Sequence, residues 1–246
     1  MSPLSVAMVT VNVAAGSISK AGAEGMGTYA IEVPEPLDAR ERRELCDLFG
    51  DLGPDAPTCC EGWRTIDLAA HLVVRERRPL AAPGIMFGGP FRGLLDRATE
   101  RALAKGYDVL VEQIRNGPPP GPFAVPGLRT VLNLNEYVVH HEDVRRANGM
   151  GPRAGRRDLQ DRLWALLRRG AALQLRSVRR DLTVRLRRTD GLDGSDITVG
   201  KGPEVIVSGE PVEMVLFLMG RRRVAQVGLA GDADAVARLE AAELGI

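Results

Sequence analysis

The sequence predicts an α+β protein in which a four-helix bundle precedes a small α+β domain. Apolar residues follow helical spacing up to about residue 149, and short alternating apolar and polar segments appear after residue 155. The 246 residues, of which 44% are hydrophobic and 26% charged, suffice for one large or two small soluble domains. No apolar run approaches the roughly 18 residues of a membrane span. We therefore expect a cytoplasmic protein.

Helix-breaking residues divide the predicted bundle, residues 37–149, into four segments. Gly53 and Pro54 end the first helix, and Thr65 is the expected N-cap of the second. Gly106 weakens the middle of the third helix, which three consecutive prolines then terminate. The predicted helices are 37–52, 66–78, 92–115 and 128–147.

The predicted C-terminal domain, residues 158–246, mixes helices with short strands, and the boundary is expected near residues 149–157. Its predicted elements are a helix at 158–175, strands at 182–186, 197–199 and 205–207, a helix at 211–219, a strand at 224–230 and a helix at 232–244. Residues 1–36 are Gly-rich in part and lack the basic start of a secretory signal. We expect them to be disordered; if Met26 is the true start, the residues upstream of it are not translated.

Composition excludes several classes of function. A net charge of +1 and 4% aromatic residues argue against nucleic acid as the main partner. Residues 153–188 hold twelve arginines against three aspartates, which indicates either an anion-binding surface or, as we prefer, a solvated face. The three cysteines form no C-x-x-C pair, so neither a disulfide framework nor a cysteine zinc site is expected. Motifs for dinucleotide binding, nucleotide hydrolysis, zinc proteolysis and serine hydrolysis are absent.

The three histidines all fall on two of the predicted bundle helices. At about 100° per residue, Glu136, His140 and Asp143 share one face of their helix. Two imidazoles and a carboxylate, from His71, His140 and Glu136, suit zinc and related divalent ions and leave one coordination position open. The alternative is a buried Glu136–His140 hydrogen bond with His71 partly exposed.

Neighbouring residues allow two interpretations each. Asp143 could accept a hydrogen bond from an imidazole that binds metal, or it could be a helix-surface carboxylate. His141 points about 100° away from His140, so we expect packing rather than metal ligation. Cys46, Cys59 and Cys60 are expected to be structural, since adjacent cysteines rarely form a disulfide without strain.

Three motifs carry a resemblance to a known family. They are Cys60-Glu61-Gly62-Trp63, Thr65-x-Asp67-Leu68-x-x-His71-Leu72 and Glu136-x-x-x-His140-His141-x-Asp143. This pattern resembles the actinobacterial mycothiol-dependent maleylpyruvate isomerase family, whose members are DinB-like metal-binding four-helix bundles. The resemblance runs from about Ala39 onward and includes Gly209-Glu210-Pro211, Gly220-Arg221 and Gly231-Asp232, which are similar to the family's second, α+β domain.

The resemblance implies a zinc ion, or another divalent metal, held by His71, Glu136 and His140, with mycothiol as thiol cosubstrate. It also implies that an arginine corresponding to Arg221 holds a substrate carboxylate, although Arg222 and Arg223 adjoin it. The expected activity is isomerisation of, or thiol transfer to, a small electrophilic substrate that bears a carboxylate. The alternatives are a non-enzymatic metal-binding or sensor protein and a hydrolase that activates water at the open position.

Overall fold

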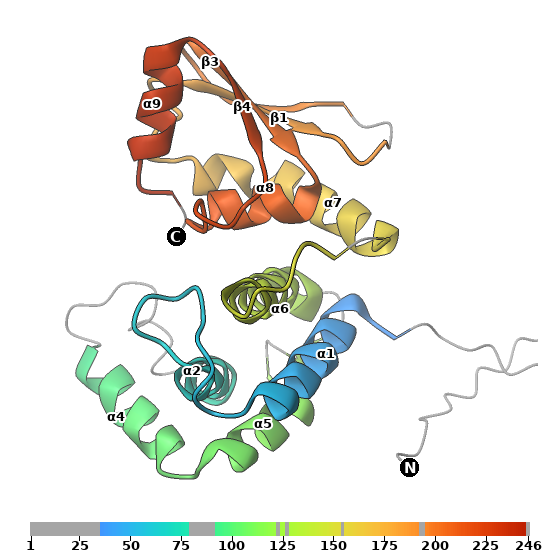
Figure 1. Cartoon of the computed structure of the whole chain (residues 1–246), viewed down its shortest axis with the longest axis vertical. Helices are drawn as coiled ribbons and strands as arrows, with labels where there is room; N and C mark the ends of the chain where they lie inside the picture. Colours follow the sequence, from blue (N-terminus) through green and yellow to red (C-terminus); the bar gives the residue numbers. More distant parts are fainter. Residues whose placement is uncertain are drawn as a thin grey trace, which may run out of the picture. The chain divides into compact units, whose positions relative to one another are not determined.

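The computed structural model describes residues 35–78, 92–121, 124–125, 128–153, 155–191 and 195–244, without the side chains of 128–132. The chain divides into two units, Met1–Glu35 and Pro36–Ile246, and the second unit contains all the elements that follow (Figure 1). The predicted N-terminal extension, residues 1–36, lies outside the described residues except for its last two. No helix within the described ranges is long and apolar enough to cross a membrane.

The helical part confirms most of the predicted elements. Its helices are α1 (Leu37–Leu52), α2 (Thr65–Arg77), α4 (Arg92–Leu103), α5 (Tyr107–Arg115) and α6 (Leu128–Ala147). The single helix predicted at 92–115 is wrong, because Gly106 adopts a φ of +86° and separates α4 from α5. Helix α1 packs against α5 and α6, while α2 packs against α4 and α5.

The start of α2 also differs from the prediction. Thr65 is the first helical residue rather than the N-cap, and its hydroxyl donates a hydrogen bond of 2.5 Å to the carbonyl of Gly53. The carboxylate of Asp67 instead accepts from the backbone N–H of Arg64, at 2.9 Å, which is the reciprocal half of a capping box. These two bonds hold the loop before α2 and fix the direction of the helix that carries His71.

The C-terminal part is α+β, as predicted. It consists of α7 (Arg157–Gln174), β1 (Thr183–Arg188), β2 (Ile197–Gly200), β3 (Glu204–Gly209), α8 (Pro211–Leu218), β4 (Gly228–Gly231) and α9 (Ala233–Ala241). The sheet has the order β2-β1-β3-β4, in which β1 and β3 are parallel and both outer pairs are antiparallel. The last strand begins later than predicted, since the N–H groups of Val224 and Ala225 bond the carbonyl of Arg221 in a turn.

Helix α6 contributes to two hydrophobic cores. Tyr137 and Val144 pack with α1, α2, α4 and α5, whereas Leu134 and Val138 pack with α7, α8 and the sheet. The connection from α6 to α7 lies at residues 148–156, and the domain boundary expected near 149–157 stays a prediction. Four consecutive polar residues of α6, from His140 to Asp143, are buried. Because buried polar groups are costly without partners, each of the four must be paired.

Candidate metal centre

His71, Glu136 and His140 converge although they come from two separate helices. One ring nitrogen or carboxylate oxygen from each lies within 4.8 Å of the others. His140 Nε2 is 3.1 Å from Glu136 Oε2, and the rings of His71 and His140 lie edge to face with their centroids 5.2 Å apart. The structure therefore brings together the three residues that the sequence predicts as metal ligands.

The second ring nitrogen of His140 is held by Asp143. Nδ1 lies 2.9 Å from Asp143 Oδ2, and the Asp143 side chain is fully buried. A carboxylate in this position favours a proton on Nδ1, which leaves Nε2 free to bind a metal. Of the two predicted roles of Asp143, the helix-surface carboxylate is wrong, because Asp143 faces the interior.

The electrostatics of the trio depend on burial and on these contacts. Burial alone would lower the pKa of His140, but hydrogen bonds to Asp143, Cys60 and Glu136 raise it well above its usual range. Burial opposes ionisation of Glu136, yet His140 and Arg75 together hold the pKa of this carboxyl far below its usual range. Burial, with the neighbouring His140, lowers the pKa of His71 to about 4, so its imidazole is neutral at pH 7. In the absence of a metal, a protonated His140 thus bridges two carboxylates.

The donor set fits a divalent metal. Two ligands at 2.0–2.1 Å from a tetrahedral zinc are about 3.3 Å apart, close to the separation between His140 Nε2 and Glu136 Oε2. A simple Glu136–His140 ion pair accounts for the same distance, but it gives His71 no role. Within the described part of the chain, no group hydrogen-bonds to a ring nitrogen of His71, whose ring instead contacts those of Trp63 and His140. A shared cation would account for the position of all three side chains.

A cavity of about 640 Å³ opens beside His71, between α2 and α4. Its walls carry an aromatic ring, a threonine and charges of both signs. The lining residues are Trp63, Asp67, His71, Arg92, Leu95, Asp96, Thr99 and Glu100. A small molecule can therefore approach the trio from the His71 side.

Arg221, which the sequence predicts as a substrate ligand, lies on the opposite side of His140. Its guanidinium contacts Asp143 through Nε and Nη2, at 3.0 and 2.8 Å. The neighbouring Arg222 instead donates to the backbone carbonyls of Glu240 and Ala242, and Arg223 is exposed. Of the three consecutive arginines, Arg221 is thus the one next to the candidate centre.

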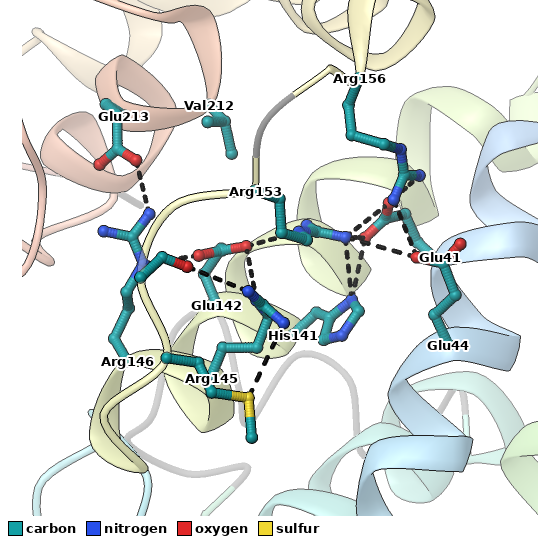
Figure 2. A network of polar contacts seen from close by, with 12 residues as sticks. Glu41, Glu44, His141, Glu142, Arg145, Arg146, Arg153, Arg156, Val212 and Glu213 are labelled. Carbon is teal, nitrogen blue, oxygen red and sulfur yellow. Dashed lines mark hydrogen bonds and ion pairs between the residues drawn. The ribbon is translucent and has the colours of Figure 1, made fainter.

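A second cluster that the sequence did not reveal surrounds His141. His141 Nδ1 is 3.1 Å from Glu41 Oε2, and Glu41, Glu44 and His141 also have the spacing of potential metal ligands. Here, however, Arg153 and Arg156 reach Glu41 at 2.9 and 2.7 Å (Figure 2). A metal ion would have to displace two guanidinium groups, so we do not assign a metal site to this cluster.

Sequence and structure comparisons supply two structural neighbours. No protein-family model matches the chain, and no curated protein matches it. The crystal structure of the mycothiol-dependent maleylpyruvate isomerase aligns with a TM-score of 0.49 and 17% identity, over 81% of this chain and 91% of that one. The crystal structure of a histidine-to-alanine mutant of this isomerase aligns with a TM-score of 0.47 and 16% identity, over 82% and 96% of the two chains. Both structures carry the name of the family that the sequence motifs resemble.

Proposed function

We propose that this protein is an enzyme that binds one divalent metal ion, for which zinc is the best fit, through His71, Glu136 and His140. The observation that carries the proposal is the convergence of these donors beside a cavity, with His71 held by no hydrogen bond among the described residues. Two imidazoles and one carboxylate are a typical zinc donor set, and three protein ligands leave a position for a small molecule.

The ligand proposed for that position is a low-molecular-weight thiol, namely mycothiol, because the motifs around the metal ligands resemble those of a mycothiol-dependent family. Zinc held by these residues would lower the pKa of a thiol bound at the open position, so that a thiolate would be available at neutral pH. The proposed reaction is isomerisation of, or thiol transfer to, a small electrophilic substrate with a carboxylate.

The protein's own residues orient the three proposed metal ligands. Asp143 fixes the ring of His140, and Arg75 Nε, 3.4 Å from Glu136 Oε1, restricts the carboxylate. The Trp63 ring lies 5.2 Å from that of His71 and limits movement of the imidazole at the edge of the cavity. Because these contacts already order the ligand side chains, less conformational entropy is lost when a metal binds.

Elemental analysis and cobalt substitution test the proposal. We expect about one metal ion per purified chain, and a sulfur-to-cobalt charge-transfer band when mycothiol is added to the cobalt form. The test variant is His71→Ala, which removes one ligand from the edge of the site and should reduce both the metal content and the charge-transfer band.

Other results would overturn the proposal in distinguishable ways. A cobalt protein that shows no sulfur band but hydrolyses esters or amides would be a water-activating hydrolase. A metal-binding protein that shows neither the band nor turnover of any electrophile would be a sensor or a metal buffer. Absence of stoichiometric metal binding would overturn the assignment of the centre itself.

A further inference from the structure

We propose that Arg221 is a positioning residue, which holds Asp143 so that Asp143 in turn holds the imidazole of His140 in its metal-binding orientation. The inference rests on the proposed function, and it gives the C-terminal α+β part a role in metal affinity. Arg221 follows α8, whereas Asp143 and His140 belong to α6. The contact thus connects the turn after α8 to the candidate metal centre.

The geometry of Arg221 is that of a carboxylate clamp. Nε donates to Asp143 Oδ1 at 3.0 Å and Nη2 donates to Oδ2 at 2.8 Å, so the two planar groups meet as a fork. Nη1 donates to the carbonyl of Met219 at 2.7 Å, and Nη2 also lies 3.5 Å from the sulfur of Cys60. Four of the five guanidinium N–H groups are therefore directed at protein atoms. Little capacity is left for a substrate carboxylate.

Asp143 depends on this clamp because its side chain is fully buried. Its Oδ2 atom accepts from His140 and Arg221 and lies 3.3 Å from the sulfur of Cys60, while its backbone carbonyl accepts from the N–H of Cys59. A buried carboxylate without a cation is unfavourable. Without Arg221, the Asp143 carboxylate would lose both hydrogen bonds of the fork and be free to rotate, and it would then hold Nδ1 of His140 less firmly.

A second buried ion pair, between α6 and α8, separates a purely structural role of Arg221 from the positioning role. Arg146 of α6 contacts Glu213 of α8 at 2.5 Å, and both side chains are buried (Figure 2). This pair also fixes the C-terminal part against α6, but it contacts neither Asp143 nor His140. Glu213→Gln is therefore a matched control for the loss of a buried α6–α8 ion pair.

The first measurement is zinc affinity by competition with a chromophoric chelator, on the full chain. We expect Arg221→Gln to weaken zinc binding by about 10-fold, the lower end of the roughly 10- to 100-fold effect of losing a residue that contacts a metal ligand, because Arg221 acts through Asp143. Arg221→Lys should fall between this variant and the wild type, because it keeps the charge but lacks the fork. Glu213→Gln should lower the unfolding midpoint and leave zinc affinity unchanged.

The second measurement needs no metal. The chain has three histidines, so their imidazole C–H resonances can be assigned by single substitutions. In the metal-free protein, Arg221→Gln should shift or broaden the resonances of His140 and leave those of His141 in place. If the wild type binds no zinc, the proposed function fails, while this measurement still decides whether Arg221 positions His140.

Two results would overturn the inference. In the first, Glu213→Gln weakens zinc binding as much as Arg221→Gln, which would make the effect one of helix docking. In the second, Arg221→Gln leaves zinc affinity and the His140 resonances unchanged but raises the KM for a carboxylate-bearing substrate. That result would support the role predicted from the sequence, in which Arg221 binds the substrate directly.

Discussion

His140 and His141 are adjacent on α6, and their surroundings differ in one respect that decides what each can do. Both rings are buried, both lie next to carboxylates, and both belong to a trio with metal-ligand spacing. Around His141, arginines satisfy the carboxylates directly. Around His140, the carboxylate that would bind metal is Glu136, and the arginine beside it among the described residues, Arg75, lies 3.4 Å away. Ligand spacing therefore does not identify a metal site unless the local charge is also counted.

The His141 cluster has balanced charges. Four carboxylates meet four arginines there, and they come from α1, α6, the segment before α7, and α8 (Figure 2). The carboxylates are Glu41, Glu44, Glu142 and Glu213, and the arginines are Arg145, Arg146, Arg153 and Arg156. Because these charges balance one another, the cluster leaves no net negative charge to attract a cation, so we interpret it as a structural ion network.

The largest effect, on zinc stoichiometry, is expected when each of the two histidines is replaced in turn by glutamine. His140→Gln should abolish stoichiometric zinc binding, because an amide does not replace an imidazole ligand, whereas His141→Gln should retain one zinc per chain. Elemental analysis after dialysis measures both, and circular dichroism should show that both variants stay folded. A double variant, His71→Ala with His140→Ala, that still holds one metal per chain would contradict the assignment.

The next largest effect is expected on stability, on the other side of α6. Glu41→Gln removes the fully buried carboxylate that contacts Arg153 and Arg156, while Glu44 still contacts both arginines. Breaking a buried ion pair typically costs about 3–5 kcal/mol, and because Glu44 remains we expect a loss near the lower end of that range. Urea unfolding of the metal-free protein measures this loss, and zinc stoichiometry should not change. As a control, Asp55→Asn removes a solvent-exposed partner of Arg64 and should cost less than about 1 kcal/mol. Equal losses of unfolding free energy in the two variants would show that the buried network stabilises the fold no more than an exposed ion pair does.

The stabilising effect of Glu41 should depend on pH. Burial would raise the pKa of Glu41, but His141 and Arg153 lower it from 4.5 to about 2. Because the folded-state pKa is depressed, this carboxylate stabilises the fold fully above pH 4.5, and the contribution disappears as the pH falls toward 2. The difference in unfolding free energy between wild type and Glu41→Gln should therefore shrink between pH 5 and pH 2. A difference that stays constant over this range would mean that Glu41 does not act through its charge.

The sequence predicted the elements well wherever a breaker residue stands at the end of an apolar pattern. The ranges 37–52 and 128–147 are confirmed for this reason. At Gly106 the apolar periodicity continues across the glycine, so the pattern alone does not show that the backbone turns there. Val224 and Ala225 have strand-like composition, yet their N–H groups are used in a turn by the carbonyl of Arg221. Composition does not encode such backbone pairing.

The candidate site was predictable to the extent that it depends on one helix. The i, i+4 and i, i+7 spacings placed Glu136, His140 and Asp143 on one face, and the structure agrees. Partners from distant segments could not be derived in this way. Arg221 meets Asp143 across 78 positions, and His141 meets Glu41 across 100. The expectation that His141 packs against apolar neighbours missed this ion network, for which the nearby arginines were the available signal.

The smallest effect on metal affinity is expected from replacing a tryptophan, and the two tryptophans lie in different parts of the fold. Trp63 is 5.2 Å from the ring of His71, whereas Trp164 lies in the core that α6 shares with the sheet. Cobalt bound by His71 should quench Trp63 because quenching by a paramagnetic ion falls steeply with distance. Trp63→Phe should remove most of the cobalt-dependent fluorescence change and weaken binding only slightly, since Phe keeps a ring beside His71. Trp164→Phe should leave the cobalt-dependent fluorescence change intact. If Trp164→Phe abolished this change and Trp63→Phe did not, the ion would lie on the other side of α6.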